Sequence, residues 1–454
     1  MPVGTAAAGA VLFGWISIYR HDRFASGGFD LGIFDQTIWG YSRFQVVANT
    51  IKGTPDLLGD HFHPILVLLA PAYWLWNDAR VLLVAQALLI ASASLPIFWW
   101  ARSRLGPAGA SCFQLGFLCF WGVLAGVLFD FHELAVAVPA LSFGIYALLE
   151  RRARLFWAMF MVGCLTKEDI ALTFAAMGVY ALLTQRRRWF GLAVLGAATA
   201  WFTITIDVIM PAISGHAYLY TGNYGRLGGT LTRDLVTLLK RPYLSVSLLF
   251  DRAAKIRTLA ELFGAWLFLP LMSPLLLLAL PSLAERFWSS NPSLWSTSYQ
   301  YSLPLAPILA YAAIDSTSRL QRLLPVDRRR KLACAIAPAV LIVGVGLVAW
   351  VVRPLAALTE YMSSAQAAAI DTCLATIPAN ASVAASQHLI PHLSHRLQIY
   401  PLYEERTPQY IAVADEPISS PETTSRHEVS TLRTSLGHYT LLCQGGATRV
   451  FRRS

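Results

Sequence analysis

Charged and histidine side chains gather in four short segments of an otherwise apolar chain. Carboxylates and imidazoles exchange protons with ligands, and an ammonium group stabilises an anion. The residues whose types and spacing could support such chemistry are Asp30, Asp35, Asp60, His61, His63, Asp130, His132, Glu133, Lys167, Glu168 and Asp169. These segments are therefore the place to look for a binding or catalytic site.

Each segment also has a structural interpretation. A single loop aspartate often does no more than cap a helix, and Asp130 to Glu133 can cap a helix that begins near Leu134. His61 and His63 alternate as in a surface loop. A pair of histidines two residues apart is only weak evidence for a metal site. Lys167, Glu168 and Asp169 can form a structural ion pair, although their expected depth in a membrane favours a functional role.

The composition indicates an integral membrane protein. Of 454 residues, 56% are hydrophobic and only 14% are charged, whereas soluble domains carry about 25% charged residues. The net charge of +10 does not indicate nucleic-acid binding, because the basic residues form short clusters between apolar runs. This is the pattern of cytoplasmic loops under the positive-inside rule, and the clusters lie at residues 102–104, 151–154, 186–188 and 328–331.

Apolar runs of about 20 residues can each span a bilayer. With the N-terminus inside, residues 3–18 form the first span and residues 20–78 a long first outer loop. Within this loop, residues 64–76 are apolar but short and favour an interfacial or partly inserted helix. Further spans are expected at 81–101, 107–129, 134–149, 191–213, 301–314 and 332–352.

Two further stretches are expected to fold as hairpins. Residues 155–184 have arginines at both ends, so a single span would place one cluster on the wrong side. A hairpin that turns at Lys167-Glu168-Asp169 avoids this and places the turn in a cavity below the outer surface. Residues 259–283 are expected to turn near Met272-Ser273-Pro274. The predicted fold is an all-α polytopic membrane protein with about 11 transmembrane helices.

The chain becomes more polar after residue 352. We expect a transmembrane domain at 1–352 and a small extracytoplasmic α/β domain at 353–454. In the second domain, residues 356–377 favour an amphipathic helix, and residues 381–385, 397–400, 410–414 and 439–443 favour strands. Cys373 and Cys443 lie in this domain and can pair if it faces an oxidising compartment.

The order of these motifs resembles a known family. Asp30-Leu31-Gly32 with Asp35-Gln36, Gly59-Asp60-His61-Phe62, Phe129-Asp130-Phe131-His132 and Lys167-Glu168-Asp169 look like those of an uncharacterised prokaryotic family of multi-pass membrane proteins. That family is grouped with the GT-C glycosyltransferases. The resemblance covers nearly the whole chain and includes Pro391-His392-Leu393-Ser394 in the C-terminal domain.

The resemblance implies a transferase of the prokaryotic plasma membrane that uses a polyprenyl-phosphate sugar as donor. Asp30, or alternatively Asp35, would be the general base toward an acceptor hydroxyl of a glycan, lipid or protein. Lys167 would hold the lipid phosphate, with Arg226 and Arg286 as alternatives. The histidines and the other carboxylates would shape the sugar and acceptor pocket. The two aspartates are five residues apart rather than a close acidic pair, so a divalent metal is left open as a cofactor.

Two other classes of function compete with this one. A transporter or lipid flippase should carry mid-membrane charges in several helices and often an internal repeat, but only one hairpin here carries such charges. A non-catalytic scaffold would not need acidic and histidine residues gathered on one side. The sequence therefore favours the transferase.

Overall fold

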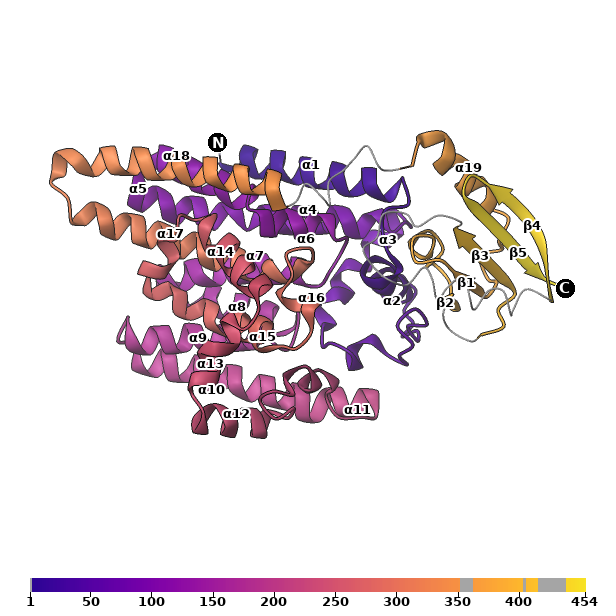
Figure 1. Cartoon of the computed structure of the whole chain (residues 1–454), viewed down its shortest axis with the longest axis horizontal. Coiled ribbons are helices and arrows are strands. Elements are labelled where there is room, and N and C mark those ends of the chain that lie inside the picture. The colour runs from indigo at the N-terminus through magenta and orange to yellow at the C-terminus, as the bar shows by residue number, and fades with distance from the viewer. Residues whose placement is uncertain (1, 352–361, 403–405, 415–437) are drawn as a thin grey trace.

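The computed structural model describes residues 2–351, 362–402, 406–414 and 438–454. Most of the chain forms a helical body, and a small sheet domain lies at one end of it (Figure 1). The helices of the body are α1 (Pro2–His21), α2 (Ile33–Ser42), α3 (Ala72–Leu75), α4 (Arg80–Ser92), α5 (Ser94–Leu118), α6 (Trp121–Leu128), α7 (Leu134–Leu149), α8 (Ala153–Cys164), α9 (Ile170–Leu183), α10 (Arg188–Ile204), α11 (Met210–Ser214), α12 (Leu231–Lys240), α13 (Tyr243–Phe250), α14 (Ala253–Gly264), α15 (Leu280–Trp288), α16 (Pro292–Trp295), α17 (Leu305–Arg322) and α18 (Val326–Val351).

Three helical stretches among the described residues are long and apolar enough to cross a membrane. They are Pro2–His21, Arg80–Leu128 and Arg188–Ser214. Leu134–Leu149, Ala153–Cys164, Ile170–Leu183 and Ala335–Trp350 are shorter apolar helices. The polytopic helical architecture agrees with the sequence, and the number of eleven spans stays a prediction.

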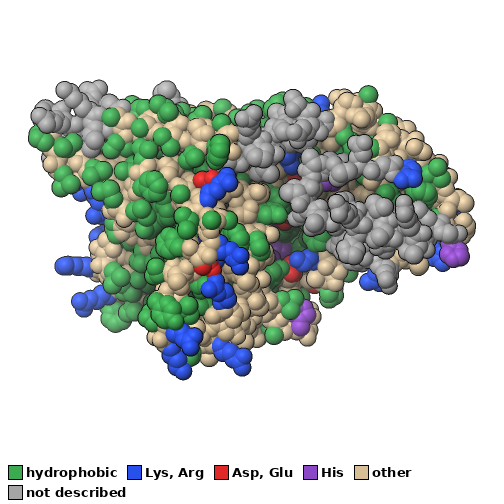
Figure 2. Space-filling view, viewed as in Figure 1, with side chains coloured by type: hydrophobic (Ala, Val, Ile, Leu, Met, Phe, Trp, Pro, Cys, Tyr) green, Lys and Arg blue, Asp and Glu red, His purple; other side chains and the backbone are tan. Residues whose placement is uncertain are grey.

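The stretch from Arg80 to Leu128 contains a sharp break at Gly106, which has φ +78° and ψ 177°. Such a backbone conformation suits glycine, and Pro107 then begins the next helical segment. The break falls between the apolar runs predicted at 81–101 and 107–129, beside Arg102 and Arg104. Lys and Arg side chains lie at the edge of the molecule opposite the sheet domain (Figure 2).

The structure contains the predicted hairpin of two short helices. Helices α8 and α9 are separated by residues 165–169, which include Lys167-Glu168-Asp169. The stretch from α14 to α15 is likewise broken, by two short 3-10 helices at Leu269–Met272 and Pro274–Ala279. At this break the Ser273 hydroxyl donates to Asp315 of α17 at 2.7 Å. Asp315 also pairs with Arg319, so the break lies beside the basic end of α17.

Residues 20–78, the predicted first outer loop, form several short helical elements. They include a short π-helical turn, η1 (Gly28–Gly32), followed by α2, the 3-10 helix η3 (Pro64–Leu69) and α3. The segment predicted to be interfacial comprises η3 and α3, and it exposes Leu68, Trp74 and Leu75. Apolar side chains of this loop form one buried cluster with those of the sheet domain, among them Leu31 and Ile390.

The described part of the C-terminal domain contains α19 (Ser364–Leu374), the 3-10 helix η10 (Ile390–His392) and the strands β1 (Val383–Ala385), β2 (Ile399–Pro401), β3 (Tyr410–Ala414), β4 (Tyr439–Gly445) and β5 (Thr448–Arg453). The sheet order is β2-β1-β3-β5-β4, with β1 parallel to both neighbours and β5 antiparallel to both of its own. Four strands lie near the predicted positions, and β5 was not predicted. The start of the helix predicted at 356–377 lies outside the described residues. A disulfide joins Cys373 of α19 to Cys443 of β4.

Candidate functional site

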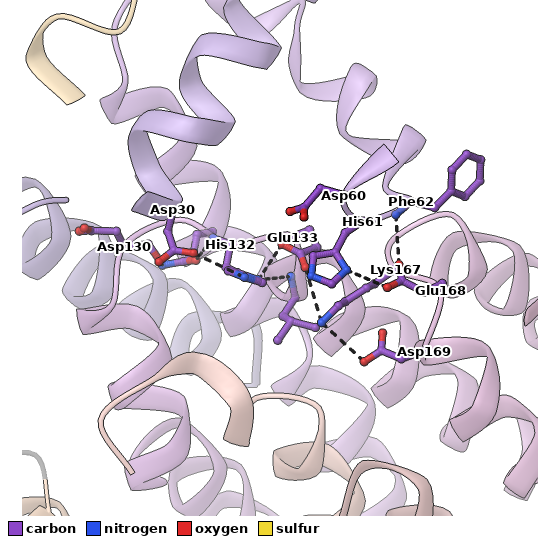
Figure 3. Close-up of polar contacts among 12 residues, drawn as sticks. Asp30, Asp60, His61, Phe62, Asp130, His132, Glu133, Lys167, Glu168 and Asp169 are labelled. Carbon is purple, nitrogen blue, oxygen red and sulfur yellow. Dashed lines mark hydrogen bonds and ion pairs between the residues drawn. The ribbon is translucent and has the colours of Figure 1, made fainter. Parts of the chain in front are cut away.

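Three connections meet where the helical body faces the C-terminal domain. They are the first outer loop, the link between α6 and α7, and the turn between α8 and α9 (Figure 3). Acidic, basic and histidine side chains are visible where the surface is hollowed between the two parts (Figure 2). The predicted clustering of polar groups from distant segments is therefore seen in space.

Asp30 lies in η1 with φ +72° and ψ −91°, close to the strained form of a γ-turn. A non-glycine residue held in such a conformation costs roughly 1–3 kcal/mol and is often found at functional sites. Its carboxylate lies 3.6 Å from Nε2 of His132. The Nδ1 atom of the same imidazole is 2.7 Å from Glu133. Asp30 thus begins a row of ionisable groups that leads into the helical body.

Lys167 continues this row. Its Nζ atom is 4.0 Å from Glu133 and 3.7 Å from Asp169. Lys167 is only 5% exposed and Glu133 is fully buried, so each charge is balanced by its neighbours. Burial and the neighbouring carboxylate of Asp169 raise the pKa of Glu285 of α15 well above its usual value. The ammonium group therefore lies among carboxylates.

Glu168 faces the first outer loop. One oxygen lies 2.7 Å from Nδ1 of His61, and the other accepts the Phe62 backbone N–H at 3.1 Å. Burial alone would lower the pKa of His61, but the neighbouring Glu168 carboxylate raises it above its usual value. Tyr218 donates a third hydrogen bond to Glu168 at 2.9 Å. Glu168 thus fixes the loop against the α8–α9 turn.

His61 and Asp60 both contact Tyr220 of the long connection after α11. The His61 ring stacks on Tyr220, with centroids 4.4 Å apart. The Tyr220 hydroxyl donates to Asp60 at 2.8 Å, and Asp60 also pairs with Lys52 at 3.2 Å. His63 is buried and lies edge-on against Phe34, which also contacts His132.

Asp130 is turned away from the row of charges (Figure 3). Its carboxylate accepts hydrogen bonds from the Ser26 hydroxyl at 3.0 Å and the Gly27 N–H at 2.9 Å. Burial raises its pKa, although Arg20 and these hydrogen bonds oppose the shift. Asp130 therefore holds the chain just before Asp30.

Asp35 lies in a different environment from Asp30. It is fully buried in α2 and accepts hydrogen bonds from Tyr73 at 2.6 Å and Ser394 at 2.5 Å. Nε2 of His395 lies 3.0 Å from it. These partners belong to the loop and the C-terminal domain, so the structure does not bring Asp35 into the group around Lys167.

The two alternative cations are engaged elsewhere. Arg226 pairs with Asp251. Arg286 is buried and donates to the carbonyls of Leu294 and Ser296 and to the Ser302 hydroxyl. Within the part of the chain that the structure describes, no group of three or more His, Cys, Asp or Glu side chains is arranged to hold a metal ion.

Sequence reasoning missed the aromatic and acidic residues that complete the site. Tyr218 and Tyr220 come from the long connection after α11, and Glu285 comes from α15. The signal was present as the tyrosine-rich segment His216-Ala217-Tyr218-Leu219-Tyr220. A tyrosine side chain combines an apolar ring with a polar hydroxyl, and it therefore suits a pocket that has both apolar and polar surfaces.

Comparison with known proteins extends these observations. The family described as "Predicted membrane protein (DUF2079)" matches residues 20–445. No curated protein is significantly similar to this chain in sequence. Among solved structures, ArnT from Cupriavidus metallidurans bound to undecaprenyl phosphate is similar with a TM-score of 0.56 at 14% identity, covering 99% of this chain and 97% of that one. Its apo state gives a TM-score of 0.54 at 14% identity, with the same coverage.

An oligosaccharyltransferase from Archaeoglobus fulgidus, tethered with an acceptor peptide, has a TM-score of 0.43 at 12% identity. That similarity covers 87% of this chain and 63% of the other. The likeness to ArnT spans both parts of the molecule, so this chain shares the fold of ArnT.

Proposed function

This chain belongs to the DUF2079 family of predicted membrane proteins, and we propose that it is a membrane glycosyltransferase. In this proposal it moves a sugar from a polyprenyl-phosphate donor to an extracytoplasmic glycan, lipid or protein. The observation that carries the proposal is the row Asp30–His132–Glu133–Lys167 in a chain that shares the fold of ArnT. A base and a cation beside apolar helices are the groups that such a lipid-linked donor requires.

Asp30 acts as the general base. As the acceptor hydroxyl attacks the anomeric carbon, its proton passes to the Asp30 carboxylate. The new bond joins the acceptor oxygen to the sugar, and the bond from the sugar to the phosphate oxygen breaks with its electron pair. The polyprenyl phosphate leaves with that added charge. His132 supports Asp30 because its imidazole is oriented by Glu133 on the opposite side.

Lys167 stabilises the departing lipid phosphate. A buried ammonium acts more strongly on a developing negative charge than an exposed one, because little water screens it. Its position between Glu133 and Asp169 fixes it in place. The remaining predicted site residues, Asp60, His61, His63, Glu168 and Asp169, then border the sugar and acceptor, while Asp130 shapes the loop.

The same proposal fixes the orientation in the prokaryotic plasma membrane. The N-terminus is cytoplasmic and the C-terminal domain is extracytoplasmic. The edge rich in Lys and Arg lies opposite that domain, which supports this orientation under the positive-inside rule (Figure 2). The disulfide in the domain suits an oxidising compartment.

The direct test is transfer of labelled sugar by the purified full chain from a panel of polyprenyl-phosphate sugars. Asp30→Asn should lower kcat by roughly 10²–10⁴-fold, the usual contribution of a general base. Asp371→Asn changes an exposed aspartate of α19 in the same way and should leave kcat unchanged. Adding a chelator to the native protein tests for a divalent metal. Binding or movement of lipid without any transfer would instead favour the transporter.

A further inference from the structure

The chain on both sides of Asp30 is held by two different parts of the molecule. On the side of the helical body, Asp130 accepts from Ser26 and Gly27, as described above. On the opposite side, the Gly28 N–H donates to the Gln387 carbonyl at 2.8 Å. The Phe29 N–H donates to the Gln387 side-chain oxygen at 3.2 Å. Gln387 therefore binds the two backbone amides that immediately precede Asp30.

The C-terminal domain fixes Gln387 itself. It lies between β1 and η10, next to Ser386, whose N–H donates to the Ala412 carbonyl and whose hydroxyl accepts from Ala414. Just beyond it, Ile390 packs against the first outer loop so closely that a Cβ atom on Gly28 would lie 2.7 Å from its Cδ1 atom. The glycine backbone thus sits directly against the C-terminal domain.

These contacts bear on the strained conformation of Asp30. A residue with φ +72° keeps such a conformation only when its surroundings impose it. Asp130 accepts from the Gly27 N–H, and Gln387 accepts from the next two backbone amides, those of Gly28 and Phe29. The direction of the Asp30 carboxylate therefore depends on the C-terminal domain.

We infer that Gln387 is a positioning residue, through which the C-terminal domain sets the orientation of the Asp30 carboxylate and completes the active site. This inference rests on the proposed function and gives the C-terminal domain a part in the chemistry. Gln387 does not touch the reacting atoms and acts only through the orientation of Asp30. We therefore expect a change at Gln387 to slow the chemical step and to leave binding of the lipid donor unchanged.

Gln387→Met tests this inference in the full chain, because methionine has a similar length but offers only a weak acceptor. We expect kcat to fall roughly ten- to a hundredfold, the effect of a small misplacement of a catalytic group, while KM for the donor is unchanged. Gln387→Glu keeps a side-chain oxygen that can accept from the Phe29 N–H, so its kcat should lie close to that of the native protein. Gln398→Met, an exposed glutamine of the same domain, is the matched control and should behave as the native protein.

Hydrogen exchange of residues 25–34 gives a readout that does not need turnover. Exchange of this segment should be faster in Gln387→Met than in the native protein and unchanged in Gln398→Met. If Gln387→Met does not accumulate as folded protein, Gln387→Ala takes its place in both measurements.

A folded Gln387 variant with native kcat, or with native exchange of residues 25–34, would overturn the inference. So would a loss of rate that appears equally in Gln398→Met or as a rise in KM alone. Absence of turnover by the native protein with every donor would instead overturn the proposed function. The exchange comparison would then still decide whether Gln387 holds the segment.

Discussion

Lys167 and Glu133 are almost excluded from solvent, and a buried charge is stable only when an opposite charge compensates it. The positive charge of Lys167 is compensated by two carboxylates, because its Nζ atom lies 4.0 Å from Glu133 and 3.7 Å from Asp169. The proposed catalytic cation is therefore also a structural residue. Loss of its charge should affect folding as well as turnover.

At the residue scale we predict that Lys167→Met lowers the free energy of unfolding by roughly 3–5 kcal/mol, because it leaves two carboxylates without their cation. Adding Glu133→Gln should restore part of that loss, since one uncompensated charge is then removed. Unfolding of the purified chain in detergent measures both effects. Lys240→Met, at an exposed position of α12, should change the stability by less than about 0.5 kcal/mol. Equal free energies of unfolding for Lys167→Met and Lys240→Met would contradict the charge balance around Lys167.

At the scale of elements, helix α9, which follows the Lys167-Glu168-Asp169 turn, packs closely on α10. Their backbones touch at two glycines. A Cβ atom on Gly178 would lie 2.8 Å from the Leu195 nitrogen, and one on Gly191 would lie 2.7 Å from the Gly178 oxygen. Small residues at a helix contact allow this close approach within a membrane.

We therefore predict that Gly178→Ala forces the two helices apart and lowers stability by roughly 1–3 kcal/mol, the usual cost of overpacking. The measurement is the midpoint of thermal unfolding in detergent. Gly196→Ala provides the control on α10, because a Cβ atom there meets no neighbour within 4 Å. A destabilisation of the same size in both variants would show that the close contact does not determine the effect.

The elements also show what the sequence could predict and why some parts escaped it. The arginine clusters at both ends of residues 155–184 required a hairpin, and the structure has α8 and α9 there. Strand β5 was missed because its end is basic, although the Gly445-Gly446 pair before it is typical of a hairpin turn. The partners of Asp35 were out of reach, since Ser394 and His395 are about 360 positions away in the sequence. Tertiary packing alone separates the environments of Asp30 and Asp35.

At the scale of the whole molecule, the C-terminal domain and the first outer loop share one apolar cluster and a set of hydrogen bonds. Gln36 donates to the Arg396 carbonyl at 3.0 Å, and Thr50 exchanges hydrogen bonds with both backbone groups of Ile399. Asp35 adds a charged contact to Ser394 and His395. Docking of the domain therefore includes an ionisable histidine paired with a buried carboxylate.

His395 makes this docking dependent on pH. Burial alone would lower its pKa, but Asp35 raises it above the usual value of about 6.5. Asp78 acts in the same direction as Asp35, and Arg43 opposes them. Because the folded protein binds this proton more tightly than the unfolded chain, the contribution to stability is fully present below about pH 6.5 and is lost as the pH rises through the folded pKa.

We predict that the native chain loses thermal stability relative to His395→Gln as the pH rises from about 6 to above the folded pKa of His395. The difference between the two unfolding midpoints, measured at each pH, isolates this contribution from other titrating groups. His438→Gln changes an exposed histidine of the same domain and should keep the native pH dependence. A native-minus-variant difference that stays constant, or grows, with rising pH would contradict the ion pair with Asp35. The C-terminal domain would then be held by its apolar contacts and neutral hydrogen bonds alone.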